Sequence, residues 1–299
     1  MRLSRRAVLQ GAALAGAALA APPARARVAR PIPADAVGML YDSTRCIGCR
    51  ACVVKCKEAN GLPPSRTRDG VYDAPPDLDG TTKNVIKLAV LDDRTAFMKA
   101  QCMHCADPAC TSVCMIGALH KNPATGVVEY EKDGCVGCRY CQVACPFNVP
   151  KFTWHAAVPQ IVKCEMCRHR SDEKRGGIFA VAHPACCEVC PRAAVVYGTR
   201  AELLEEAQRR LVAMPDRYDA KIYGERDAGG TQVLYLTARG VPFARLGLPD
   251  VGEEPAPALA ETVQHGIYYG MIAPAVLFAA ALVAVGRRKG DAASEEDAR

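Results

Sequence analysis

The pattern of apolar and polar residues predicts short strands, one amphipathic helix and one long apolar segment. Apolar, β-branched segments predict strands at 85–91, 126–130 and 231–236. Residues 201–212, "AELLEEAQRRLV", place apolar side chains at helical spacing after a Thr-x-x-Glu capping box. We predict that residues 38–56, which precede and contain the first cysteine-rich stretch, form a loop. We expect these short strands and helices to belong to an α+β fold.

The longest apolar run is the uncharged stretch 266–286, which the basic triplet 287–289 follows at once. About 20 apolar residues cross the hydrocarbon core of a bilayer, so we predict a transmembrane helix over 263–286, with a buried helix as the alternative. Basic residues beside a span stay in the cytoplasm. The tail 287–299 is therefore expected inside, and the preceding domain on the periplasmic face of the inner membrane.

The N-terminal residues 1–26 have the pattern of an export signal. The stretch "SRRAVLQ" at 4–10 precedes an alanine-rich segment that is too short for a good membrane span. This order is typical of a twin-arginine signal peptide, with cleavage after Ala20 or Ala26. Such a signal predicts export of a protein that has already folded.

Composition adds one unusual feature, the cysteine content. The chain has 299 residues and a hydrophobic share of 50%, enough for one large or two ordinary domains. Aromatic residues make up 6%, whereas cysteines number 17. The formal charge of +6 counts cysteines as neutral, and no basic run interleaved with aromatics indicates nucleic-acid binding. Five basic residues among the cysteines either offset cluster charge or are ordinary solvated surface: Arg45, Arg50, Lys55, Arg139 and Lys163.

All but one of the cysteines fall into four runs of four. The first and third share the spacing C-x2-C-x2-C-x3-C, and Pro146 completes the bacterial ferredoxin motif in the third. The second and fourth have the same ends and longer middles. In order, the runs are Cys46, Cys49, Cys52 and Cys56; Cys102, Cys105, Cys110 and Cys114; Cys135, Cys138, Cys141 and Cys145; and Cys164, Cys167, Cys186 and Cys190.

This spacing has a physical reason. A turn of backbone presents thiolates two residues apart to three corners of a cubic cluster, and the x3 step lets a helix start and carries the fourth thiolate to the other cluster of a pair. Four runs therefore predict four [4Fe-4S] clusters in two diclusters. The alternatives are a disulfide scaffold, zinc sites, or a smaller cluster in the second or fourth run.

Three residues near the runs raise separate questions. The seventeenth cysteine, Cys187, is predicted to be a buried small apolar residue, because an x3 count back from Cys190 selects Cys186 as the ligand. His104 either donates a hydrogen bond to cluster sulfur or is merely packed or solvated. Met115 follows the second run where the third and fourth runs have proline, which affects local helix geometry more than ligation.

The motifs together resemble a known family. "GMLYDSTRCIGCRACVVKC", "QCMHCADPAC", "CVGCRYCQVACPFNVPKF", "KCEMC" and "CCEVCPRAAVVYGTR" are similar to the four-cluster electron-transfer subunits of membrane oxidoreductases, most of all to those of hydrogenases. The resemblance implies duplicated ferredoxin-like dicluster domains with insertions over 27–200, then a C-terminal extension and linker over 201–262 that leads to the transmembrane helix.

The resemblance also implies ligand sets and partners. Runs one and four exchange their fourth cysteines, as do runs two and three, which gives the sets Cys46, Cys49, Cys52 and Cys190; Cys102, Cys105, Cys110 and Cys145; Cys135, Cys138, Cys141 and Cys114; and Cys164, Cys167, Cys186 and Cys56. The implied partners are the small and large subunits of a nickel–iron hydrogenase and an integral membrane subunit that reacts with quinone. A formate dehydrogenase or another molybdopterin oxidoreductase is the alternative. No residue suggests hydrogen or formate chemistry, so we expect an electron conductor and no catalytic residue.

Overall fold

The structure is a computed structural model that describes residues 30–65, 75, 77–92, 94–170, 184–257, 270–271 and 274–282. Residues 28–257 form one compact unit, and the two chain ends form another. The predicted signal peptide 1–26 and tail 287–299 lie outside the described residues.

A three-stranded sheet joins segments from both ends of the large unit. Its strands are β1 (Val37–Asp42), β8 (Val195–Thr199) and β9 (Val233–Leu236), with β1 in the centre. Strand β1 runs antiparallel to β8, with Val37 opposite Thr199, and parallel to β9, with Met39 opposite Val233. The prediction of a loop over 38–56 is therefore wrong at both ends. The segment "GMLYD" pairs with two strands that lie far away in sequence, and residues 51–56 belong to helix α2 (Ala51–Ala59).

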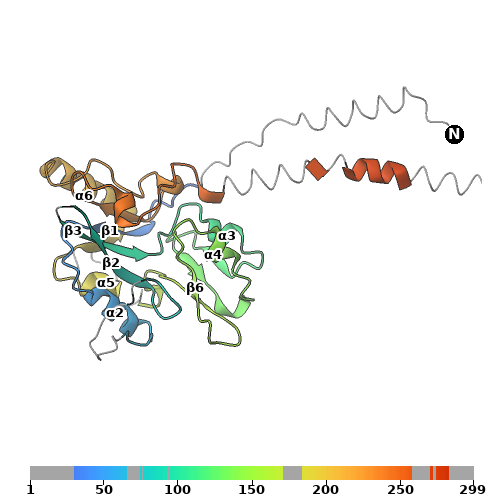
Figure 1. Cartoon of the computed structure of the whole chain (residues 1–299), viewed down its shortest axis with the longest axis horizontal. Coiled ribbons are helices and arrows are strands. Elements are labelled where there is room, and N and C mark those ends of the chain that lie inside the picture. Colours follow the sequence, from blue (N-terminus) through green and yellow to red (C-terminus); the bar gives the residue numbers. More distant parts are fainter. Residues whose placement is uncertain are drawn as a thin grey trace, which may run out of the picture. The chain divides into compact units, whose positions relative to one another are not determined.

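Helix α6 (Arg200–Ala213) packs on this sheet (Figure 1). The predicted capping box is confirmed, since Thr199 and Glu202 exchange side-chain and backbone hydrogen bonds. Leu203 and Ala207 are buried in one cluster with Leu40 and Leu234 of the sheet. The segment after residue 200 thus contributes both a helix and the strand β9 to the core that holds β1.

Three hairpin-like strand pairs complete the β-structure. Strands β2 (Asn84–Val90) and β3 (Thr95–Gln101) pair with Asn84 opposite Gln101. The shorter pairs are β4 (Leu119–Lys121) with β5 (Val128–Tyr130), and β6 (Lys151–Phe152) with β7 (Ile161–Val162). The strands predicted at 85–91, 126–130 and 231–236 are confirmed, with shifted ends, as β2, β5 and β9.

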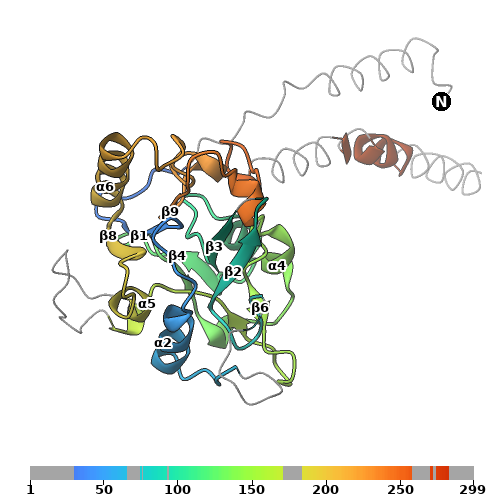
Figure 2. The ribbon, with the colours of Figure 1, turned by 60° about the vertical axis from the view of Figure 1, so that its left-hand side comes forward.

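Four short helices follow the cysteine loops. They are α2 (Ala51–Ala59), α3 (Ala109–Ser112), α4 (Tyr140–Ala144) and α5 (Ala185–Glu188). Helix α2 contacts α5, and α3 contacts α4 (Figures 1 and 2). Short 3-10 turns lie at Lys132–Gly134, Arg168–Arg170, Asp227–Gly229 and Phe243–Leu246. Helices from the first and fourth runs therefore form one pair, and helices from the second and third runs form the other.

The second unit is described only at residues 270–271 and 274–282, which are helical. Within the described part of the chain, no helix is long and apolar enough to cross a membrane. The predicted transmembrane helix over 263–286 extends past the described residues on both sides.

Candidate iron–sulfur site

Each cysteine loop turns into its helix one residue before the third cysteine. Cys52, Cys110, Cys141 and Cys186 each occupy the second position of their helix, in α2, α3, α4 and α5. The sequence predicts that each helix starts in the x3 step, after the third cysteine. In the structure each helix starts before the third cysteine. In α2 the third and fourth cysteines, Cys52 and Cys56, lie one helical turn apart.

The first two cysteines of each run flank a residue with left-handed backbone. These residues are Gly48 (φ 70°), His104 (φ 48°), Gly137 (φ 69°) and Met166 (φ 52°), all directly before the second cysteine. At Gly48 a Cβ atom would lie 2.3 Å from the ring of Phe97, so this turn requires glycine for space as well as for conformation. All four loops therefore share the same turn between their first two cysteines.

The thiols of runs one and four lie in two neighbouring sets. Cys46, Cys49, Cys52 and Cys190 line one cavity. Cys164 interacts electrostatically with Cys186, Cys56 and Cys167. Each set thus takes three thiols from one run and one from the other.

Runs two and three show the same exchange. Cys105 interacts electrostatically with Cys145, Cys102 and Cys110. Cys141 interacts in the same way with Cys138, Cys114 and Cys135. The structure therefore brings together the groups that the family resemblance implies, while the assignment of ligands stays a prediction.

The chemistry of the donors fits iron–sulfur clusters. All seventeen cysteines are free thiols, so none is used in a disulfide. Burial, aided by the charge of neighbouring thiolates, raises the pKa of Cys52 and of Cys56 to about 12. Without iron these two thiols keep their protons at neutral pH, and iron displaces the proton when the thiolate ligates it.

Backbone amides support several sulfur atoms. The amide of Ala194 donates to Cys190 Sγ at 3.2 Å, and the amides of Leu119 and Met166 donate to Cys114 and Cys164 Sγ at 3.4 Å. Hydrogen bonds to ligand sulfur are among the features that set the potential of a cluster. These residues follow the cysteines in sequence, so the loops themselves supply the donors.

Comparison with known proteins agrees with this geometry. A family model described as "4Fe-4S dicluster domain" matches residues 94–200. Over 93% of its length the chain is 40% identical to the hydrogenase-2 operon protein HybA of Escherichia coli O157:H7, of which 92% is covered. The chain belongs to the HybA family. It is a ferredoxin-like iron–sulfur electron-transfer subunit that binds [4Fe-4S] clusters.

Relatives of HybA from formate dehydrogenases are also similar. The iron-sulfur subunit of formate dehydrogenase-O of Escherichia coli K12 is 32% identical over 86% of each chain. The nitrate-inducible formate dehydrogenase iron-sulfur subunit of the same organism is 34% identical over 67% of each chain. The HybA family thus shares its cluster-binding architecture with subunits of a different oxidoreductase.

Cys187, the cysteine outside the runs, is only partly buried in this HybA-family chain. The prediction of a buried apolar residue is therefore wrong in part. The Cys187 side chain hydrogen-bonds to Cys186, and this bond lowers the pKa of Cys186 to about 6 and raises that of Cys187. Cys187 thus favours the thiolate form of the residue next to it.

His104 is fully buried, which excludes the solvated alternative. Its Nδ1 accepts a hydrogen bond of 2.9 Å from the amide of Val128, so the neutral ring carries its proton on Nε2. Burial, with the positive charges of Lys163 and Lys121, lowers the pKa of His104 well below its ordinary value. Among the described residues, Nε2 has no hydrogen-bond partner. Donation to cluster sulfur stays a prediction.

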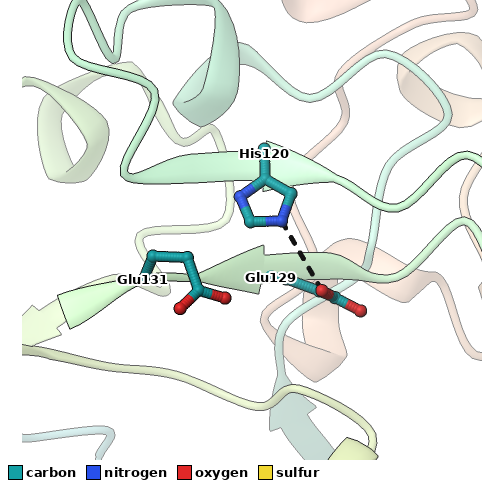
Figure 3. Close-up of side chains that lie close together, drawn as sticks. All are labelled: His120, Glu129 and Glu131. Atoms are coloured by element: carbon teal, nitrogen blue, oxygen red, sulfur yellow. Dashed lines mark ion pairs between the residues drawn. The ribbon is translucent and has the colours of Figure 1, made fainter. Parts of the chain in front are cut away.

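His120, Glu129 and Glu131 form a group that contains no cysteine (Figure 3). His120 Nε2 lies 3.5 Å from Glu129 Oε2. Nη1 of Arg168 lies 2.9 Å from Glu129 Oε2 and 3.0 Å from Glu131 Oε1. Because Arg168 already pairs with both carboxylates, we interpret the group as an ion-pair network.

Sequence reasoning missed most of the buried lysines. Of the five basic residues named among the cysteine runs, only Lys163 is buried, and its ammonium donates to the carbonyls of Val128 and Cys164. Lys99, which is also buried, was not singled out. Its position between apolar neighbours in "FMKAQ" resembles an ordinary outward position of a strand, so the sequence carries no local signal for it.

Proposed function

We propose that the chain carries four [4Fe-4S] clusters and relays electrons between a periplasmic nickel–iron hydrogenase and a quinone-reactive integral membrane subunit. The observation that carries this proposal is the identity of 40% to a hydrogenase-2 operon protein over nearly the whole chain. When bound, each cluster takes up and gives back one electron. The hydrogenase performs the hydrogen chemistry, and this chain conducts the electrons.

The four sets of neighbouring thiols support the proposed number of clusters. Each set contains four sulfur atoms, the number that a cubane cluster needs. Residues from the two ends of the cysteine-rich region share the first and fourth sets, and residues from its middle share the second and third. Two ferredoxin-like diclusters follow from this exchange.

Two exposed cysteines support sites of electron exchange at the surface. Cys49 and Cys138, each the second cysteine of its run, are exposed, whereas the other ligands are buried or partly buried. Cys49 belongs to the set of run one and Cys138 to the set of run three. We therefore place the two ends of the relay at these sets, with the sets of runs four and two between them.

The surface near Cys138 is apolar. Met115, Val136 and Val143 are 82%, 70% and 86% exposed, although all three are near in sequence to ligands of the run-three set. Exposed apolar side chains around a functional group are typical of a protein interface. This surface suits an apolar partner, and we assign it to the membrane subunit.

The surface near Cys46 is basic instead. A cavity of about 390 Å³ is lined by Glu206 and five arginines, Arg45, Arg192, Arg209, Arg210 and Arg217. Charge complementarity favours an acidic partner surface here and speeds encounter. We assign this end of the relay to the hydrogenase.

The proposed location rests on the chain ends. The twin-arginine pattern within 1–26 supports export after cluster insertion, and the apolar run within 263–286 supports a single membrane anchor with its tail in the cytoplasm. An export route for folded proteins suits a cofactor that is assembled in the reducing cytoplasm.

Purification of the intact complex tests the proposed partners. A tag after Arg299 would be used to isolate the chain from native membranes in mild detergent, and mass spectrometry would identify what accompanies it. We expect the large and small subunits of a nickel–iron hydrogenase together with a multi-span membrane protein. A molybdopterin subunit in their place would favour the formate dehydrogenase alternative, which the similarity to formate dehydrogenase iron-sulfur subunits supports.

A further inference from the structure

Lys99 places an ammonium group inside the protein without a carboxylate beside it. The residue lies on β3 and is only 1% exposed. Its Nζ donates a hydrogen bond of 2.6 Å to Gln101 Oε1, and no ion pair links it to a carboxylate of the described residues. Fully buried lysines are rare unless they are paired, because a lone buried charge is costly. The counter-charge of Lys99 must therefore come from another group.

The polar atoms next to Lys99 hold it in place. Gln101, which accepts the bond from Nζ, directs its own amide nitrogen to Met39 Sδ at 3.1 Å. The backbone carbonyl of Lys99 accepts a hydrogen bond of 2.8 Å from Tyr235 Oη. Strands β1, β3 and β9 thus fix both ends of this residue. Because none of these partners carries a charge, they orient the ammonium but do not neutralise it.

Thiols of two cluster sites surround Lys99. It lines the same cavity as Cys46, Cys49, Cys52 and Cys190. It also interacts electrostatically with Cys186, Cys164 and Cys56, which belong to the neighbouring set. Lys99 therefore lies beside the thiols of both sets.

We propose that Lys99 is a positioning residue for electron transfer: its fixed positive charge is shared by the two cluster sites of runs one and four and raises the reduction potential of both. This inference rests on the ligand sets of the proposed function. One side chain outside the cysteine motifs then controls electron transfer between the cluster sites of runs one and four.

The sign follows from charge balance. Reduction adds one electron, and so one negative charge, to a site without forming or breaking a bond. A cation held nearby in a medium of low dielectric constant stabilises the more negative form. Because Lys99 adjoins both sites, the effect applies to both, and the electron is held more firmly at this end than it would be beside a neutral residue.

The other half of the protein has lysines of its own near its thiols, Lys121 and Lys163, and both donate to uncharged oxygens. Lys121 interacts with Cys105, Cys102 and Cys110, but its Nζ donates to three oxygens, those of Cys105, Gly126 and the Gln232 side chain. Removing Lys99 should therefore change two of the four potentials and leave the other two.

The test is a redox titration of the purified full-length protein, loaded with iron and sulfide and reduced stepwise by dithionite under electron paramagnetic resonance. In Lys99→Met we expect two clusters to be at least tenfold harder to reduce, about 59 mV for a one-electron couple, with iron content unchanged. The matched control is Lys87→Met on the paired strand β2, where the lysine side chain is 37% exposed and contacts Asp77. The control should keep all four potentials.

Two further variants keep the test decisive if Lys99→Met does not retain its iron. Lys99→Arg preserves the charge and Lys99→Gln removes it, so the arginine variant should keep wild-type potentials and the glutamine variant should lower two of them. Iron loss from both neutral variants, with normal loading of Lys99→Arg, also supports the role of the charge. Unchanged potentials in a loaded neutral variant, or iron loss from Lys99→Arg as well, would overturn it. Wild-type protein with about eight iron atoms would instead contradict the four-cluster premise.

Discussion

Asp42, the last residue of β1, and Arg210, in the last turn of α6, form a buried ion pair in which Oδ2 lies 3.0 Å from Nη1. The pair links α6 to β1, the strand that precedes run one. In Arg210→Ala the carboxylate stays buried without its cation, which costs about 3 kcal/mol or more. We expect the melting temperature of the loaded protein, followed by circular dichroism, to fall by about 6–12 °C.

The neighbouring arginine provides the control for this prediction. Arg209 is 76% exposed and pairs with Glu206, which also pairs with Arg210. Arg209→Ala should cost at most about 1 kcal/mol, because exposed ion pairs contribute little. Similar losses in the two variants would contradict the role given to burial.

Tyr218 makes the same site sensitive to high pH. Its Oη donates to Asp42 Oδ2 at 2.7 Å, and burial together with this bond raises the pKa of Tyr218 above its ordinary value of 10.0. Above pH 10 the unfolded chain loses this proton and the folded chain keeps it, so the stabilisation is complete below pH 10 and is lost as the pH rises. Tyr218→Phe should lower the melting temperature at pH 8, and the difference from wild type should shrink above pH 10. A difference independent of pH would refute this interpretation.

Cluster content follows from the four sets of thiols. Protein purified without oxygen should contain about sixteen iron and sixteen acid-labile sulfide atoms per chain, because four cubane clusters require them. Colorimetric iron and sulfide determinations, with metal analysis by mass spectrometry, measure this. About eight iron atoms with stoichiometric zinc would exclude the four-cluster proposal.

Cys186 and Cys187 should behave differently when either is replaced by serine. Cys186 is buried, is separated from Cys190 by three residues as the C-x3-C spacing requires, and neighbours Cys164 and Cys56, whereas Cys187 only hydrogen-bonds to it. Cys186→Ser should therefore lose or convert one cluster, and Cys187→Ser should keep about sixteen iron atoms. Equal loss of iron in the two variants would show that the assignment of the ligand is wrong.

The chain ends should control location separately. Replacing Arg5 and Arg6 with lysine should leave folded, cluster-bearing protein in the cytoplasm, because the export receptor recognises the arginine pair and not charge alone. Truncation before His265 should allow export and release most of the iron–sulfur domain from the membrane. Cell fractionation with immunoblotting measures both outcomes.

Protease treatment of intact spheroplasts tests the orientation. The iron–sulfur domain should be accessible, and a tag after Arg299 should be protected, because the triplet 287–289 is expected in the cytoplasm. Cleavage of the tag from outside would reverse the proposed orientation. It would also remove the basis for placing the relay on the periplasmic face.

The sequence predicts this protein best where geometry is local. Cysteine spacing, the capping box at Thr199 and the apolar strands depend on residues within one or two turns of each other, so they could be interpreted directly. Strand β1 could not, because its partners β8 and β9 begin at Val195 and Val233 and nothing near residue 37 indicates them. Lys99 was missed for the same reason, since only the folded chain shows which thiols surround it.

The central position of β1 also dictates when the protein can be completed. Both edges of β1 pair with strands that the ribosome makes more than 150 residues later. Contacts that close such long loops form slowly. Cys190, which completes the cavity of run one, arrives equally late. Iron delivered before residue 190 is made would find only three of the four thiols of the run-one set. The first site can therefore be completed only after most of the chain has been made, and β9, the last strand, then closes the sheet that holds the first cysteine loop.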